Sequence, residues 1–346
     1  MQPVNLENKK LLVVRADNIG DLVCTTPLIK AIKEQYPSVT MDVMLNTYNE
    51  TVLANNPYIR KIISYEKAKH RKGSLIKTYI NKFLFFRRLK KERYDYALLA
   101  AGGFKEKEVG YVSLAGIKKL IGYVDRPNQK SKLFAAIESQ DRDKIHEVEL
   151  VYNLGKKVLG LTKDPGEMLL YPDNKLVDAL KERFNINDED KPIGVHLSSR
   201  KPQNRWPIES YVELIKQIHA NNITQPILVF WSPGSENNPL HPGDDEKAEY
   251  LKEQLSHIKG LNLYFVETKH LSELIAGVSL CDSFICCDGG TMHIAAALVN
   301  QMVAIFGSTN ADNWKPWKVK HHLLQSPSKN AQDISVTEVV NAFLDL

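Results

Sequence analysis

Short apolar runs alternate with amphipathic segments along the whole chain. Apolar runs with the length and composition of buried strands cover residues 11–14, 39–45, 96–99, 193–196, 226–230, 262–266, 283–287 and 303–306. Between them, apolar residues recur at helical spacing over residues 22–35, 208–220, 245–255 and 271–277. Strands that alternate with helices in this way predict parallel sheets covered by helices, which is an α/β fold.

Polar stretches at residues 171–174 and 187–190 interrupt this pattern near the middle of the chain. A chain of 346 residues is long enough for two domains, each with its own core. We therefore predict two domains, residues 1–174 and 175–346. Each is expected to be a doubly wound, Rossmann-like sheet, with the open strand ends of both facing a central cleft.

The composition is that of a folded globular protein, with 43% hydrophobic and 25% charged residues. No segment reaches the roughly 18 uninterrupted apolar residues of a membrane span, and the first residues lack the basic and apolar regions of a signal peptide. These features predict a cytoplasmic protein. No CxxC spacing occurs, which favours buried, reduced thiols over zinc ligands or disulfides for the four cysteines, Cys24, Cys281, Cys286 and Cys287.

Positive charge is concentrated in the N-terminal half. Residues 1–174 hold 30 Lys and Arg against 20 Asp and Glu, whereas residues 175–346 hold 16 against 21. Between residues 67 and 93, eleven cations accompany one acid, and apolar residues recur at helical spacing. This pattern predicts a basic amphipathic helix, which either packs on its own domain as a solvated helix or contacts a membrane surface or an anionic acceptor. Nucleic acid is not expected, because no recognition motif accompanies the charge.

Residues 288–293 form the most informative stretch of the sequence. An apolar run precedes Asp288, two glycines follow it, and a small, apolar segment comes next, so the stretch predicts strand, turn and helix. The free N–H groups and the dipole at a helix start both favour an anion such as a diphosphate. The alternative is an ordinary crossover turn in which Asp288 caps the helix.

The loop after the first strand, residues 15–21, carries one glycine in place of the three in a dinucleotide-binding fingerprint. A nicotinamide site is therefore not favoured. Asp21 stands where a strand opens into a helix, which suits a general base, although N-capping explains many aspartates at such positions. A second loop, residues 197–207, gathers cations and hydroxyls that could clamp a diphosphate, among them Ser198, Ser199, Lys201 and Arg205.

Together, these three loops resemble those of glycosyltransferase family 9, the bacterial ADP-heptose:lipopolysaccharide heptosyltransferases, and the resemblance covers nearly the whole chain. The matching residues are 14–21 with 25–28 in the first signature, Ser199, 205–207 and Tyr211 in the second, and 288–295 in the third, followed by 306–309, Trp314 and Trp317. The resemblance implies a GT-B fold, in which the C-terminal domain binds a nucleotide-sugar donor and the N-terminal domain binds the acceptor.

Each matching residue inherits an expected role from this resemblance. Asp21 matches the catalytic base, and Asp288 matches the acid that holds the donor sugar. The diphosphate cradle is matched by Gly289, Gly290 and Thr291, and Arg205 matches a cation directed at the phosphates. His293 either helps the donor site or packs its helix, and Glu236 is the first choice for the acid that binds the ribose. Acceptor contacts are expected from Arg15 and Asp17 in the first loop. Independently of the resemblance, the charge of the basic helix suits an anionic acceptor, so contacts are also expected from Arg87, Arg88, Lys90 and Lys91.

From these residues we expect an inverting transferase that passes heptose from ADP-heptose to a lipopolysaccharide inner-core sugar. No cofactor and no metal are expected, because Asp17, Asp21 and Asp288 lie in different domains without ligand spacing. The expected location is the cytoplasm, with peripheral contact at the cytoplasmic face of the inner membrane. The alternatives are a related transferase with another acceptor, such as a protein hydroxyl or another glycan, and a nucleotide-sugar-binding protein without turnover.

Overall fold

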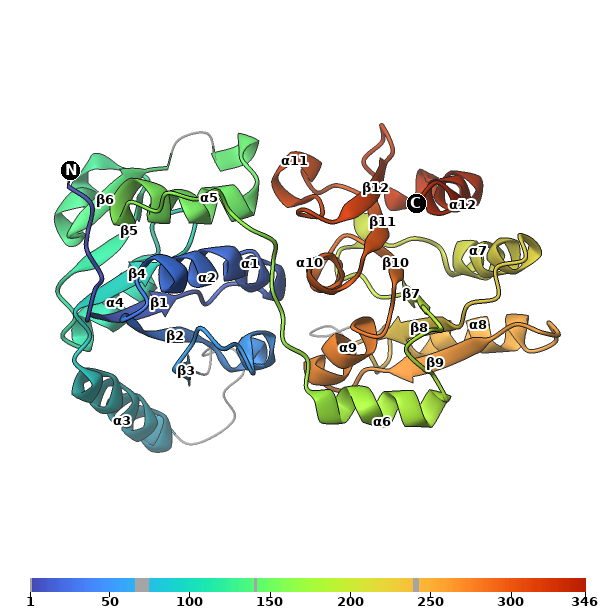
Figure 1. Cartoon of the computed structure of the whole chain (residues 1–346), viewed down its shortest axis with the longest axis horizontal. Helices are drawn as coiled ribbons and strands as arrows, with labels where there is room; N and C mark the ends of the chain where they lie inside the picture. Colours follow the sequence, from blue (N-terminus) through green and yellow to red (C-terminus); the bar gives the residue numbers. More distant parts are fainter. Residues whose placement is uncertain (1, 66–74, 140–141, 239–242) are drawn as a thin grey trace. The chain divides into compact units, whose positions relative to one another are not determined.

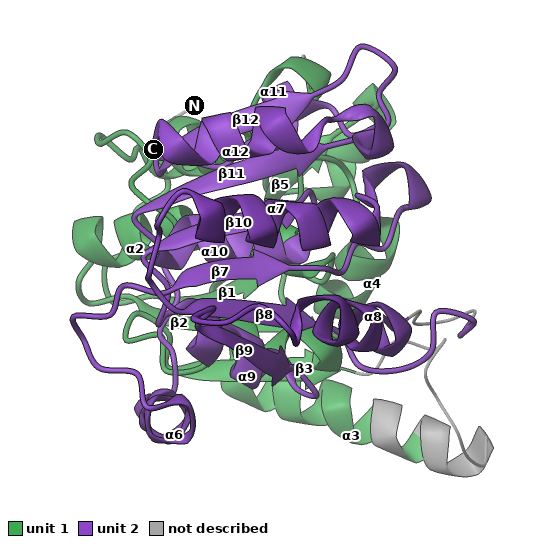
Figure 2. Cartoon of the chain, turned by 90° about the vertical axis from the view of Figure 1, so that its right-hand side faces the viewer, with its two compact units in different colours: residues 1–168 green, residues 169–346 purple. Residues whose placement is uncertain are grey.

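The computed structural model describes residues 2–65, 75–139, 142–238 and 243–346. The chain forms two compact units, residues 1–168 and 169–346 (Figure 2). The boundary predicted after residue 174 lies six residues beyond the observed one, at the first residue of α6 (Asn174–Phe184). This helix packs on α9 (Leu271–Val278) of the second unit. Each unit is a six-stranded parallel sheet flanked by helices (Figure 1).

The first unit has the strand order β3-β2-β1-β4-β5-β6, and each described pair is parallel. Its strands are β1 (Lys10–Val14), β2 (Thr40–Asn46), β3 (Lys61–Tyr65), β4 (Tyr96–Leu99), β5 (Leu120–Val124) and β6 (Ala135–Glu138). Its α-helices are α1 (Ile19–Val23), α2 (Thr26–Gln35), α3 (Leu75–Glu92), α4 (Glu106–Leu114) and α5 (Glu147–Leu154). This order is that of the doubly wound dinucleotide-binding fold, so the predicted fold class is confirmed for this unit.

The second unit has the order β12-β11-β10-β7-β8-β9, which is the same topology starting from β7. Its strands are β7 (Ile193–His196), β8 (Ile227–Trp231), β9 (Leu263–Glu267), β10 (Ser283–Cys287), β11 (Gln301–Phe306) and β12 (Lys320–Gln325). Besides α6 and α9, its α-helices are α7 (Ile208–Ala220), α8 (Asp245–Leu255), α10 (Gly290–Leu298), α11 (Ala311–Trp314) and α12 (Val336–Leu344). All eight predicted strands are present in the two sheets, within one or two residues of the predicted bounds.

Four strands escaped the sequence prediction, and three of them, β3, β6 and β12, are edge strands. An edge strand is buried on fewer sides, so its sequence need not be continuously apolar, and β12 reads Lys-His-His-Leu-Leu-Gln. The fourth, β5, contains Gly122, where a Cβ would lie 3.2 Å from the Leu99 Cβ on the neighbouring strand. Close packing therefore requires a residue that weakens the sequence signal for a strand.

The single helix predicted over residues 22–35 is wrong, because the chain forms two helices there. The break lies at Cys24 and Thr25, and α2 carries Pro27 in its first turn. Proline has no N–H to donate and is tolerated in a first turn, so the second helix restarts around it. The predicted basic helix corresponds to α3, and residues 66–74 of that prediction lie outside the described residues.

Both sheets are buried at their centres. The side chains of Leu11, Leu12, Val13 and Val14 in β1 are 0% exposed, as expected for a parallel strand covered on both faces. At Gly194 in β7, a Cβ would clash with the ring of Phe284 in β10, so the glycine permits the two strands to pack. All four cysteines are free and buried, which confirms the prediction of buried thiols.

Candidate active site

In each sheet the order in which successive strands are added reverses at one point. This point lies between β1 and β4 in the first unit and between β7 and β10 in the second. Crossover helices leave such a switch point on opposite faces of the sheet, so the carboxyl ends of its strands remain open to a ligand. The predicted loops fall at these two points. Residues 15–21 follow β1, and residues 197–207 and 288–291 follow β7 and β10.

Asp21 is held by three hydrogen bonds in the first unit. Its Oδ1 accepts from Arg15 Nη2 at 2.7 Å, and its Oδ2 accepts from both the backbone N–H and the Nδ2 of Asn18 at 3.1 Å. The Asp21 side chain is 15% exposed. The N-cap of α1 is Asn18 and not Asp21. Asp21 is the third helical residue, and its carboxylate forms a capping box with the Asn18 backbone N–H. The same contacts fix the direction of the carboxylate.

Arg15 lies beneath this carboxylate and is 1% exposed. Its Nη2 also contacts Glu147 Oε1 at 2.6 Å, and its Nη1 donates to the carbonyl of Ala100, directly after β4. Contact between Arg15 and an acceptor was expected from the sequence, but the side chain is enclosed within the unit. The structure instead gives Arg15 the role of holding two carboxylates.

Glu147 is the functional neighbour that sequence reasoning missed, because it comes from the start of α5, far along the chain. Burial raises the pKa of Glu147, and Arg15 only partly offsets this effect. Burial also raises the pKa of Asp21, but Arg15 and Asn18 outweigh it and hold that pKa below its usual value. Arg15 lowers the pKa of both carboxyls, but only Asp21 also accepts hydrogen bonds from Asn18, which leaves Asp21 the more strongly ionised.

Asp17 lies at the same sheet edge, with Oδ1 3.2 Å from Lys105 Nζ, in the loop after β4. The structure does not bring the predicted acceptor residues of α3 there. Lys10 opens β1, and its Nζ donates to the carbonyl of Glu92, the last residue of α3, at 2.9 Å. The end of α3 therefore lies at the amino edge of the sheet, opposite the edge that carries Asp21. This end carries Arg87, Arg88, Lys90 and Lys91.

Asp288 lies at the switch point of the second unit, directly after β10, and is 8% exposed. Its Oδ2 accepts from Asn204 Nδ2 at 2.7 Å and from Thr309 Oγ1 at 2.6 Å. Burial raises the pKa of Asp288, and Thr309, Lys201 and Asn204 counteract this effect. Asn204 and Thr309 were not predicted as site residues, because neutral side chains in loops give no signal until the fold brings them onto an acid.

The turn after Asp288 offers backbone to a ligand. A Cβ at Gly289 would meet nothing within 4 Å, so open space borders this backbone. No side chain caps α10, so its first N–H groups are available to an anion. Thr291 Oγ1 lies 3.4 Å from Nε2 of His196. Burial lowers the pKa of His196 to about 4. A neutral imidazole therefore stands beside the predicted diphosphate cradle.

His293, which the sequence left between two roles, is 3% exposed. Its ring meets Trp314 edge to face at 5.7 Å between centroids. This position favours the packing role over contact with a donor.

The loop after β7 is braced by the residues predicted to clamp the diphosphate. Ser198 Oγ accepts from the Ser232 N–H at 2.9 Å, and Ser199 Oγ donates to the Asp288 carbonyl at 3.2 Å. Arg205 Nε donates to the Ser199 carbonyl at 2.9 Å. In this structure Arg205 therefore stabilises its own loop. Lys201 is exposed, and its positive charge acts to lower the pKa of Asp288.

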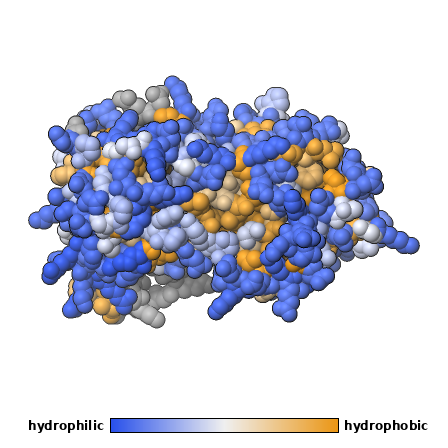
Figure 3. Space-filling view, in the orientation of Figure 1, coloured by the Kyte–Doolittle hydropathy of each residue, from blue (hydrophilic) through white to orange (hydrophobic). Residues whose placement is uncertain are grey.

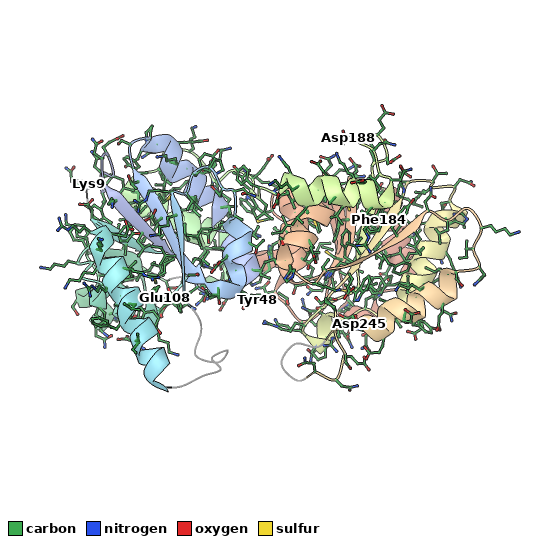
Figure 4. All side chains as sticks on the ribbon, turned by 90° about the horizontal axis from the view of Figure 1, so that it is seen from below. Lys9, Tyr48, Glu108, Phe184, Asp188 and Asp245 are labelled. Atoms are coloured by element: carbon green, nitrogen blue, oxygen red, sulfur yellow. The ribbon has the colours of Figure 1, made fainter. Side chains whose placement is uncertain are left out.

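Glu236, the predicted ribose acid, is exposed in the loop after β8. The loop is fastened by Asp245 at the start of α8 (Figure 4), which accepts from Trp231 Nε1 and from the Gly234 N–H, both at 2.8 Å. Asp245 is therefore committed to the loop, and Glu236 remains the candidate for the ribose.

The described part of the chain contains no group of three or more His, Cys, Asp and Glu residues that could hold a metal ion. It also contains no helix with the length and apolarity needed to cross a bilayer. That the chain needs no metal stays a prediction.

Comparison with known proteins identifies related chains. A family model described as glycosyltransferase family 9 (heptosyltransferase) matches residues 83–342. Lipopolysaccharide heptosyltransferase 2 of Escherichia coli (strain K12) is 23% identical over 333 residues, which cover 91% of this chain and 88% of that protein.

Solved structures agree in fold. A family 9 glycosyltransferase from Veillonella parvula superposes with a TM-score of 0.83 at 17% identity, covering 99% of this chain and 98% of the other. Escherichia coli heptosyltransferase WaaC with ADP-2-deoxy-2-fluoro heptose gives 0.74 at 16% identity, covering 97% and 99%. The fold is GT-B, as the resemblance implied.

The shared guanidinium predicts how Glu147 affects Asp21. In Glu147→Gln, a negative charge beside Asp21 is lost, so the pKa of Asp21 should fall further. The acid limb of the pH profile of kcat/KM should then move to lower pH, and kcat should drop roughly 3- to 10-fold because the base is weaker. The matched control is Glu149→Gln, an exposed position on the same helix. A Glu147→Gln profile that superposes on that of the unmodified protein would refute this coupling.

The hydrogen bond from Thr309 predicts a second effect. Thr309→Val keeps the shape of the side chain but removes the donor to Asp288, which should weaken nucleotide-sugar binding about 10-fold. Since Asp288 is expected to hold the sugar, binding of the bare nucleoside diphosphate should change little. Calorimetry with both ligands measures the difference, and Thr309→Ser should restore binding. Equal losses for both ligands would contradict a role for this bond in holding the sugar.

Proposed function

The chain belongs to glycosyltransferase family 9, the heptosyltransferase family, and from this membership we propose that it transfers heptose from ADP-heptose to a lipopolysaccharide inner-core sugar. The enzyme class follows from the family, whereas the donor and the acceptor are our proposal. Support for the donor comes from relatives, since one neighbour in structure is described as a heptosyltransferase with ADP-2-deoxy-2-fluoro heptose.

The observation that carries the proposal is the paired placement of Asp21 and Asp288, each at the switch point of its own sheet. A transferase needs an acid that holds the donor and a base that activates the acceptor. Asp288 is fixed by Asn204 and Thr309 next to an uncapped helix start. Asp21 is fixed by Arg15 and Asn18 in an ionised state.

In the proposed reaction, the Asp21 carboxylate takes the proton from an acceptor hydroxyl. The hydroxyl oxygen attacks the anomeric carbon of the donor sugar from the face opposite the diphosphate, and the bond between that carbon and the phosphate oxygen breaks. The configuration is inverted, and ADP leaves. Negative charge grows on the departing diphosphate, where the N–H groups of α10 and the Lys201 ammonium can stabilise it.

We assign acceptor binding to the first unit and donor binding to the second. No metal or cofactor enters the proposed reaction, because N–H groups and cations can serve the diphosphate. The proposed location is the cytoplasm, at the inner face of the inner membrane, where a lipid-linked core would be available.

A panel of substrates tests this function. The purified protein is incubated with ADP-heptose, or with ADP-glucose as the control donor, and with truncated core oligosaccharides. ADP release and the mass of the product are then measured. We expect transfer of one heptose from ADP-heptose alone, and a loss of roughly 100- to 10,000-fold in Asp21→Asn, with donor affinity retained. Product formation at the full rate by Asp21→Asn would remove this residue from the mechanism.

Two of the three cations in the loop after β7, Lys201 and Arg205, should differ in effect. Lys201→Ala should lower ADP affinity about 10-fold while leaving the loop intact, because an exposed ammonium acts directly on the phosphates. Arg205→Ala should impair donor affinity and kcat together, because it releases the Ser199 carbonyl and with it the contact to Asp288. Calorimetry and steady-state kinetics distinguish the two, with the exposed Arg200→Ala as the control. ADP affinity that is unaffected in both variants would place the phosphates elsewhere.

A further inference from the structure

The outward face of α3 exposes large apolar side chains. Ile80 is 53% exposed, Phe83 is 64% exposed and Leu84 is 40% exposed. These residues are three or four positions apart, so they are neighbours on one side of the helix. Hydrophobic residues reach the surface over α3 at the lower left of Figure 3.

The helix α3 also has a side that packs on the first unit, so it is not exposed all round. The opposite side of α3 is packed: Leu89 is 1% exposed, and the rings of Phe85 and Phe86 lie 6.2 Å from Tyr65 and 5.6 Å from Tyr111, respectively. The helix therefore carries two apolar faces, one used by the core of the first unit and one turned to the surroundings.

Cationic side chains lie on the same outward face toward the C-terminal end of α3. At about 100° per residue, positions 80, 84, 87 and 91 form one line along α3, and positions 83, 88 and 90 flank it. Arg87, Arg88, Lys90 and Lys91 are all exposed. The acid at the end of α3, Glu92, turns away to Arg60 at 2.8 Å and Lys61 at 3.2 Å. The described outward face thus combines apolar and cationic groups without an acid.

We propose that this face of α3 docks the protein on an anionic lipid bilayer. Apolar side chains can enter the boundary between headgroups and acyl chains, and neighbouring cations meet the headgroup phosphates. The charge selects this occupant, because an apolar protein partner would leave the four cations without counter-charges. The surface ends at the amino edge of the sheet, so docking leaves the edge with Asp21 free for a sugar.

The expected affinity follows from the charges. Each cation near an anionic membrane surface strengthens binding about fivefold, so the four together contribute on the order of 100- to 1,000-fold. The attraction is screened by salt, so binding should weaken strongly between low and high ionic strength. One helix face without a lipid anchor gives reversible binding.

Sedimentation with lipid vesicles tests the proposal. We expect the full chain to bind vesicles of phosphatidylglycerol and phosphatidylcholine, and to bind vesicles of phosphatidylcholine alone at least 10-fold less. Replacing Arg87, Arg88, Lys90 and Lys91 with Gln should lower binding to anionic vesicles on the order of 100-fold. Phe83→Ala with Leu84→Ala should lower it about 10-fold. The matched control removes the same charge from exposed positions of the second unit, by Lys175→Gln, Lys259→Gln, Lys269→Gln and Lys329→Gln.

Three outcomes would overturn the proposal. The first is equal binding to both kinds of vesicle, and the second is an equal loss in the control variant. The third is a dimer in sedimentation velocity that Phe83→Ala with Leu84→Ala converts to a monomer, since a second copy would then cover the face. Circular dichroism and the thermal unfolding midpoint verify that each variant is folded. The inference goes beyond the proposed reaction and does not depend on it, because vesicle binding is measured without turnover.

Discussion

The reversal of strand order beside β1 and beside β7 is the constraint on which the candidate site depends. Parallel strands are joined by crossovers, and at the point of reversal the crossovers leave on opposite faces of the sheet. The carboxyl ends of two adjacent strands are then left uncovered. Both acids that matter here follow such strands, Asp21 after β1 and Asp288 after β10. The same topology, repeated in the second half of the chain, therefore yields one open edge per unit and one fixed carboxylate at each.

The two carboxylates are held in different ways. Asp21 is held by a buried cation, and burying a guanidinium costs several kcal/mol unless it is well paired, so Arg15 also engages Glu147 and the Ala100 carbonyl. Asp288 is held by neutral donors from Asn204 and Thr309. The pKa of Asp21 is consequently lowered and that of Asp288 is raised. A base must be ionised before it can take a proton, whereas an acid that accepts hydrogen bonds from a sugar needs mainly a fixed direction.

Positive charge in the first unit lies in two separate regions. Lys105 lies with Asp17 at the edge that carries Asp21, and the exposed cations of α3 lie at the opposite edge. The excess of cations in the N-terminal half thus does not mark one binding surface. A substrate that is part charged sugar and part membrane lipid would meet both regions with different parts, which is consistent with the family and with the proposed docking of α3.

The sequence by itself determined the α/β class, the buried strands, the division into two halves and the three loops that carry the family signatures. These features are local, because a continuous apolar run, a glycine pair or a cation-rich loop can be recognised from a few consecutive residues. It could not determine the edge strand β12, the buried position of Arg15, or the contacts of Glu147, Asn204 and Thr309. Those depend on which distant segments the sheet brings together: α5 reaches Arg15, and the loops after β7 and β11 reach Asp288. Tertiary structure also decided that the basic end of α3 lies away from Asp21, since a helix antiparallel to its strands finishes at their amino edge.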